Sequence, residues 1–114
     1  MQSYLLITYE DFEKVEIRVG KVVQAEVVPE ARKPAYKLWI DFGKYGVKRS
    51  SAQIMKFYTL EELIGKQVLA VTNFPPQQIA NFMSEVLALG VVVDEGEIVL
   101  IQPDHSIPPS RCIL

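Results

Sequence analysis

Hydrophobic and polar residues alternate along much of this chain, which is the pattern of β-strands that bury one face. The longest alternation covers residues 15–27, and a second covers residues 36–42. A Gly-Lys-Tyr-Gly turn then leads into a third strand at residues 47–52, which predicts a hairpin with a largely basic outer face. Gly20 interrupts the first strand, and a glycine in a strand this long predicts a bulge or bend at that position.

The rest of the chain is organised around residues 68–90, which read as strand, loop and strand because two apolar ends enclose a polar, proline-containing middle. The double proline follows Asn73 and Phe74 directly. Since proline restricts the residue before it and offers no amide donor, these two side chains are predicted to stand at a stiff strand exit, within reach of a ligand. The alternative is that Phe74 and Phe82 cap the core while Asn73 makes a turn hydrogen bond.

Two capping motifs predict short helices in an otherwise β-rich chain. Thr8 is placed to cap a helical turn at residues 9–13. Thr59, with Glu62 three residues later, forms a capping box at the start of a helix near residues 60–64. The second helix would therefore lie between the third and fourth strands.

Two more strands are expected at residues 85–93 and 97–102, separated by an Asp-Glu-Gly turn. This order predicts an all-β fold, the five-stranded Greek-key barrel of the oligonucleotide- and oligosaccharide-binding (OB) fold with one short helix between strands 3 and 4. A small β-sandwich is the alternative. A length of 114 residues with 49% hydrophobic content predicts one domain over residues 1–114. Residues 103–114 would form an extended C-terminal tail.

The residues that commonly carry catalysis or bind metals are scarce. Cys112 is the single cysteine and His105 the single histidine, so no internal disulfide, catalytic triad or metal-ligand set is expected. The glycines are scattered rather than gathered into a phosphate-binding loop. The apolar runs are too short to span a membrane, and no basic segment precedes one at the N-terminus. We therefore expect a cytoplasmic, non-enzymatic protein without metal, cofactor or membrane insertion.

The net charge of -2 conceals a strong segregation of charge. Between residues 32 and 56 there are seven basic residues against one acid, Asp41. Such a cluster suits a polyanion, but the solvated face of a hairpin gives the same count, and charge alone favours neither. The basic residues are Arg32, Lys33, Lys37, Lys44, Lys48, Arg49 and Lys56.

Residues 11–20, Asp-Phe-Glu-Lys-Val-Glu-Ile-Arg-Val-Gly, resemble the opening of the tRNA-binding domains attached to methionyl-tRNA synthetases and related aminoacylation cofactors. Further blocks resemble the CsaA family of export-related cytoplasmic chaperones more closely. This resemblance implies a homodimeric barrel without catalytic activity that holds unfolded or precursor polypeptides, with the export machinery as a further partner. The blocks are residues 29–32, 34–38, 40–43, 50–54, 73–76 and 84–87.

Two ligand hypotheses follow, and we favour polypeptide holding because the CsaA-like blocks are the most specific feature. In it, adaptable apolar side chains form a groove; they are Trp39, Phe74, Ile79, Phe82 and Met83. The alternative is tRNA recognised by shape, with basic residues on phosphates, polar residues on backbone or base edges, and Phe74 as a stacking face. Its candidates are Lys33, Lys37, Lys48, Arg49, Ser51, Gln53, Asn73, Ser84 and Glu85. Under a third interpretation the apolar residues simply fill the core.

The chain ends are too apolar to be free tails, and a barrel this small has little interior left to take them. Two-fold pairing would let one apolar patch bury itself against its copy. We therefore expect a homodimer, with residues 1–10 as the dimerisation lead. The apolar residues of the two ends are Tyr4, Leu5, Leu6, Ile7, Ile107, Ile113 and Leu114.

Overall fold

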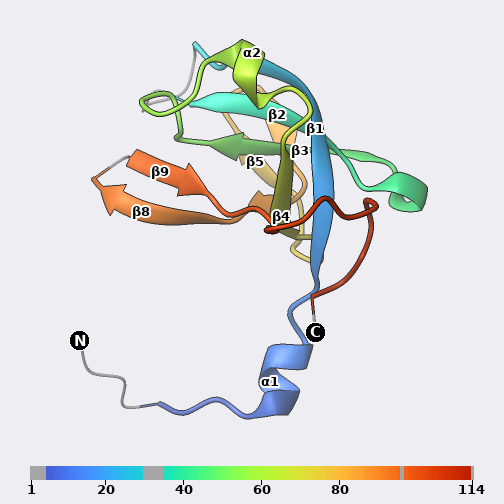
Figure 1. The fold of residues 1–114 in the computed structure, drawn as a ribbon. Helices are drawn as coiled ribbons and strands as arrows, with labels where there is room; N and C mark the ends of the chain where they lie inside the picture. Colours follow the sequence, from blue (N-terminus) through green and yellow to red (C-terminus); the bar gives the residue numbers. More distant parts are fainter. Residues whose placement is uncertain (1–4, 30–34, 96, 114) are drawn as a thin grey trace.

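Five antiparallel strands form a nearly closed barrel in the computed structural model, which describes residues 5–29, 35–95 and 97–113 (Figure 1). Their order across the sheet is β3-β2-β1-β4-β7. The fold is mostly β with two short α-helices, which confirms the predicted OB-type barrel. The strands are β1 (Ile17–Val27), β2 (Tyr36–Asp41), β3 (Val47–Ala52), β4 (Gln67–Val71) and β7 (Leu87–Ala88).

The long strand β1 serves both halves of the barrel. Its first half pairs with β4, ending at the partners Lys21 and Gln67, and its second half pairs with β2 from Lys21 onward. The register shifts between Val22 and Gln24, so the irregularity lies beyond the glycine. The predicted bulge at Gly20 is therefore wrong in position.

Gly20 has a different role. Because it has no side chain, the side chains of Ile40 and Phe42 can pack directly against the backbone of β1. A Cβ atom at this position would lie 2.7 Å from Cε1 of Phe42 and would also overlap the side chain of Ile40. Both of these side chains are buried in the core. The absence of a side chain at residue 20 is thus a requirement of barrel packing.

Both predicted capping motifs are confirmed. In α1 (Tyr9–Glu13), Thr8 Oγ1 accepts a hydrogen bond from the amide of Asp11 at 3.1 Å, and the Asp11 carboxylate accepts one from the amide of Thr8. In α2 (Leu60–Leu63), Thr59 and Glu62 make the same reciprocal pair at 3.3 and 2.7 Å. Helix α2 lies between β3 and β4, as predicted. A single 3-10 turn, η1 (Gly43–Tyr45), connects β2 to β3.

The segment between β4 and β7 contains more structure than the predicted loop. It folds into a small hairpin of β5 (Gln77–Ile79) and β6 (Phe82–Ser84), with Ala80 at a φ of 51° in the turn. The strand expected at residues 85–93 is also divided, into β7 and β8 (Gly90–Asp94). Strand β8 pairs with β9 (Glu97–Leu100) in a separate hairpin. Short, interrupted strands of this kind give too little alternation to be predicted from sequence.

Most side chains of the barrel interior are apolar, and the one buried polar side chain in the described residues is Ser50. Its hydroxyl accepts a hydrogen bond from the amide of Ala88 at 3.2 Å, which ties β7 to β3. The hydrophobic residues with no exposed surface are Val22, Leu38, Ile40, Ile54, Leu63, Val68 and Ala70.

The C-terminal tail and the N-terminal lead behave differently. Residues 110–113 run along β1, where the amide of Val19 donates to Arg111 O at 3.0 Å and the amide of Ile113 donates to Ile17 O at 2.9 Å. The expected tail is thus docked rather than free. In contrast, residues 5–8 and α1 stand apart from the barrel (Figure 1), and Leu6 is 94% exposed. No helix among the described residues has the length and apolar character needed to cross a membrane.

Candidate ligand cleft

Phe74 separates two neighbouring hollows, each of about 300 Å³, which together we call the Phe74 cleft. The two hollows share Phe74, Glu85 and Val86. The charged compartment is otherwise lined by Glu16, Arg18, Phe42, Tyr45, Lys48, Thr72 and Pro76. The apolar compartment is otherwise lined by Ser51, Pro75, Gln77, Ile79, Ser84 and Leu87.

One wall of the charged compartment is the ion pair of Glu16 and Arg18. Glu16 directly precedes β1 and Arg18 is its second residue, so their side chains lie on the same face of the chain. Glu16 Oε1 accepts hydrogen bonds from Thr72 Oγ1 at 2.6 Å and from Arg18 Nε at 3.1 Å. These two hydrogen bonds hold the pKa of Glu16 below its usual value, and the bond from Thr72 has the larger effect. The carboxylate is therefore ionised at neutral pH. The hydrogen bond to Glu16 in turn raises the pKa of Arg18.

Arg18 is held by two further contacts, and it connects the cleft to the tail. Its Nη1 donates to the backbone carbonyl of Ser110 at 2.7 Å. Its guanidinium lies over the ring of Tyr45, 4.1 Å from the centroid, in a cation–π contact. The side chain is only 14% exposed. Arg18 is therefore fixed in orientation.

A second ion pair fixes the opposite side of the cleft. Glu85 Oε1 accepts hydrogen bonds from the amide of Arg49 at 3.0 Å and from its Nε at 3.3 Å. The amides of Glu85 and Val86 both donate to Arg49 O. Ser84 Oγ accepts a hydrogen bond from the amide of Ser51 at 3.3 Å. These bonds attach the segment after β6 firmly to β3.

Four of the predicted nucleic-acid contacts, Arg49, Ser51, Ser84 and Glu85, are thus brought together, but they bond mainly to one another. Asn73 is also engaged within the protein: its Oδ1 accepts from the amide of Glu16 at 3.0 Å, and its Nδ2 donates to Lys14 O at 2.7 Å. Both bonds join Asn73 to the segment just before β1, so neither is the turn hydrogen bond of the alternative interpretation.

The predicted apolar groove is brought together only in part. Phe74 is 52% exposed, and with Ile79 it lines the apolar compartment. Phe82 is only 5% exposed, because β6 packs against β3 of the barrel. Its predicted position on the surface of the groove is therefore wrong. Trp39 and Met83 lie outside the described lining of the cleft.

The remaining basic and polar candidates occupy varied positions. Lys37 places its ammonium 4.8 Å from the ring centroids of both Trp39 and Phe82, and Lys48 lines the charged compartment. Gln53 is half-buried just beyond β3. Lys33 lies outside the described residues.

Four cleft residues were not predicted from the sequence: Glu16, Arg18, Tyr45 and Thr72. They come from three separate segments that the barrel brings together. A usable signal existed at the start of β1, where Glu16 directly precedes the strand and Arg18 is its second residue, so that extended backbone places both side chains on one face. Within the part of the chain that the structure describes, no group of three or more His, Cys, Asp or Glu side chains is placed to hold a metal ion.

Comparisons with known proteins give consistent results. Residues 17–111 match the family described as "Putative tRNA binding domain". Methionine–tRNA ligases of Methanococcoides burtonii and Pelodictyon phaeoclathratiforme are 34% and 38% identical over 108 and 104 residues, covering 95% and 91% of this chain. The match takes up 16% and 15% of those ligases, so the chain spans about one sixth of their length.

Solved structures that cover nearly the whole chain are also similar. The chaperone CsaA of Bacillus anthracis is 49% identical with a TM-score of 0.92, and the match covers 96% of this chain and 100% of that one. The CsaA chaperone protein of Picrophilus torridus is 49% identical with a TM-score of 0.86 over the same shares. The MetRS related protein of Pyrococcus horikoshii is 25% identical with a TM-score of 0.83, covering 96% and 99% of the two chains. This chain therefore belongs to the tRNA-binding domain family, and within it to the CsaA group.

Proposed function

We propose that this chain is a non-catalytic cytoplasmic module that holds unfolded or export-bound polypeptides in the Phe74 cleft. The observation that carries the proposal is the exposed ring of Phe74, which borders two hollows and is 52% exposed in a segment attached to the barrel. A large apolar side chain held open to solvent beside a hollow is typical of a binding surface rather than of a core. The similarity to CsaA chaperones supports the same function.

The apolar compartment suits one apolar side chain of a client. Its apolar lining consists of Phe74, Pro75, Ile79, Val86 and Leu87, and Leu87 is 46% exposed. Burying one leucine- or phenylalanine-sized side chain contributes about 1.5–3 kcal/mol. One compartment would therefore bind weakly, which suits a protein that holds many sequences and releases them.

We also propose that the module acts as a homodimer, with residues 1–10 in the interface. Leu6 and Ile7 are 94% and 71% exposed, and the helix α1 that follows them stands apart from its own barrel (Figure 1). A second copy would cover these side chains and place two clefts on one assembly. Two linked weak sites can gain about 10²–10⁴ in avidity on one long client. Deleting residues 1–7 should therefore produce monomers in light scattering and weaken client retention, and a monomeric full-length protein at micromolar concentration would contradict the model.

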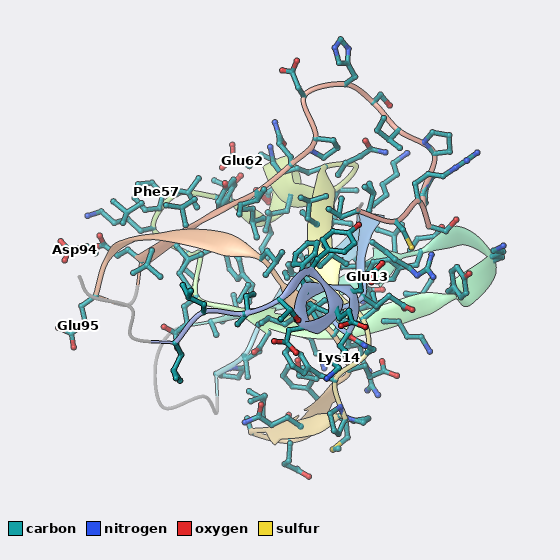
Figure 2. The ribbon with its side chains drawn as sticks, turned by 90° about the horizontal axis from the view of Figure 1, so that it is seen from below. Glu13, Lys14, Phe57, Glu62, Asp94 and Glu95 are labelled. Carbon is teal, nitrogen blue, oxygen red and sulfur yellow. The ribbon has the colours of Figure 1, made fainter. Side chains whose placement is uncertain are left out.

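The direct test of polypeptide holding compares Phe74→Ala with the control Phe57→Ala, since Phe57 is also a partly exposed phenylalanine, at 39%. In Figure 2, Phe57 lies toward the edge of the molecule, on the side of Asp94 and Glu95. With a permanently unfolded, reduced and alkylated polypeptide as client, Phe74→Ala should weaken binding about tenfold, the equivalent of roughly 1.4 kcal/mol. Equal binding by the two variants, or a large drop in melting temperature for Phe74→Ala, would contradict the proposal.

A second candidate function is tRNA binding, favoured by the family match and by one feature of the charge distribution. Lys48 forms no salt bridge with any residue the structure describes, and Lys37 lies on the neighbouring strand of the same hairpin. Replacing both with alanine should weaken tRNA binding and reduce the slope of log K against log salt by about one unit per lost phosphate contact. An unchanged slope would show that the basic residues form only a solvated face.

A further inference from the structure

The apolar compartment lies beside an open edge of the barrel sheet. Strand β3 is the last strand in the order β3-β2-β1-β4-β7. Its neighbour β6 packs against it but pairs with β5 in a separate two-stranded sheet. In the part of the chain that the structure describes, no ladder of backbone hydrogen bonds therefore joins β3 to β6. We call this open junction the β3–β6 seam.

At the seam, side chains satisfy backbone groups that a neighbouring strand would otherwise satisfy. The amide of Arg49 donates to Glu85 Oε1 at 3.0 Å, and the amide of Ser51 donates to Ser84 Oγ at 3.3 Å. Backbone groups of a strand point to alternate sides, so Arg49 and Ser51 both face away from β2. The carbonyl of Arg49 accepts the amide of Glu85. The carbonyl of Ser51 accepts only the hydroxyl of the adjacent Ser50 among the described residues, at 3.1 Å.

These two positions on β3 differ in how firmly they are closed. The acceptor at Arg49 is a carboxylate, and hydrogen bonds to an ionised acceptor are roughly twice as strong as those between neutral groups. The acceptor at Ser51 is a neutral hydroxyl at a long distance, on a side chain that turns about a single bond. Ser84 Oγ also keeps a second partner, because it donates to Val86 O at 3.3 Å. The amide of Ser51 can therefore exchange this acceptor for another at low cost.

Ser51 and Ser84 both line the apolar compartment, next to Ile79 and Leu87. A main-chain carbonyl in the place of Ser84 Oγ would accept the amide of Ser51, and the amide of the same residue would donate to Ser51 O. Opposite residues of an antiparallel pair exchange both bonds in this way. A chain bound like this turns successive side chains to opposite faces. One side chain would then meet the apolar lining while its neighbours on either side point away.

We propose that the apolar compartment binds a polypeptide by its main chain, as a short strand added to β3 at Ser51, where Ser84 Oγ occupies the position of the client's carbonyl oxygen until it is displaced. In strand addition the main chain supplies the affinity, and pockets for alternate side chains supply the specificity. The inference rests on the proposed polypeptide holding and specifies its ligand, an extended segment with free amides and one apolar side chain. Every non-proline residue carries the same two backbone groups, which explains how one compartment accepts many sequences.

The test is a calorimetric titration of the full chain with three acetylated, amidated peptides of alternating leucine and threonine. One peptide is unmodified, one is N-methylated at every leucine, and one at every threonine. Only one of the two sets of amides faces β3 in an added strand, so methylating that set should weaken binding by at least about tenfold, and methylating the other by less than about threefold. A slip by one residue cannot restore binding, because it would place threonine against the apolar lining. Each methylated peptide is thus the matched control for the other.

Ser84→Ala tests the displaced hydroxyl from the side of the protein. The peptide no longer competes with an internal acceptor for the amide of Ser51, so the unmodified peptide should bind about two- to tenfold more tightly. A Ser84 hydroxyl that only supports the cleft or contacts the ligand would have the opposite effect, since its removal would weaken binding. Ser106→Ala removes a hydroxyl from an exposed position outside the cleft and should leave the affinity unchanged.

Phe74→Ala separates failure of strand addition from failure of polypeptide holding. If Phe74→Ala weakens binding but the two methylated peptides bind equally well, or if Ser84→Ala binds the unmodified peptide more weakly, polypeptide holding stands and strand addition is overturned. An unmodified peptide that does not bind, or that binds Phe74→Ala as tightly as the unaltered protein, would overturn both.

Discussion

Replacing Gly20 with alanine is the most direct test of how tightly the barrel closes. The added Cβ would lie 2.7 and 2.9 Å from Cε1 and Cδ1 of Phe42 and would overlap the Ile40 side chain. Neither neighbour has room to withdraw, because Phe42 is 1% and Ile40 0% exposed. Overpacking of this kind costs about 1–3 kcal/mol. The lower conformational entropy of unfolded alanine relative to glycine offsets about 0.4–1 kcal/mol of it.

We therefore expect Gly20→Ala to lower the free energy of unfolding by about 1–2 kcal/mol, or the melting temperature by about 4–8 °C for a chain of this size. Urea titration should show a lower midpoint with an unchanged m-value. Lys21→Ala, at the exposed neighbouring position, is the control and should change the midpoint little. Gly20→Ala combined with Phe42→Leu should cost less than the sum of the two single changes, because the shorter side chain relieves the overlap with Phe42 and leaves only that with Ile40. A melting temperature within 1 °C of the unaltered protein would refute the packing argument.

Three further predictions concern the cleft and its support. Because hydrogen bonds from Thr72 and Arg18 lower the pKa of Glu16, its contribution to stability is present above the unfolded-state pKa and is lost as the pH falls through the lower folded-state pKa. The difference in melting temperature between the unaltered protein and Glu16→Gln should therefore shrink from neutral to acid pH, and a constant difference would contradict this. Asn73→Ala removes both side-chain bonds to the start of β1 and should destabilise by about 1 kcal/mol, with faster hydrogen exchange at the amide of Glu16. Phe82→Ala should lower the free energy of unfolding by about 3–5 kcal/mol, because the ring is buried. In the same denaturant titration, Met83→Ala should lower it by less than about 1 kcal/mol, because Met83 is exposed. Equal losses would place both side chains in the core.

Local signals in the sequence predicted the barrel well where they were strong. The cap at Thr8 and the capping box of Thr59 and Glu62 identified both helices, because a side chain that satisfies a helix amide leaves a recognisable pattern. Long alternation identified β1 and β2, because a half-buried strand repeats every two residues. The glycine-containing turn at residues 43–46 identified β3. The β5–β6 hairpin was missed because its strands are only three residues long, and β5 follows two prolines directly.

The cleft was harder to predict because its chemistry depends on contacts between distant segments. Asn73 and Glu85 were recognised as unusual polar residues at strand ends, but the sequence does not show that their partners are Lys14 and Glu16 in one case and Arg49 in the other. A polar side chain beside a turn serves equally well as a ligand contact or as an internal support. Phe74 was predicted to be exposed because it precedes a proline at the end of a strand, and the structure confirms this position.

The docking of residues 110–113 on β1 couples local opening of this segment to the cleft. These residues supply backbone bonds to Val19 and Ile17, and the carbonyl of Ser110 accepts the bond that holds Arg18 in place. When the segment opens, the first half of β1 loses a hydrogen-bonded neighbour and the wall of the charged compartment loses its support. Opening of this one segment would therefore loosen the cleft while the barrel itself stays folded.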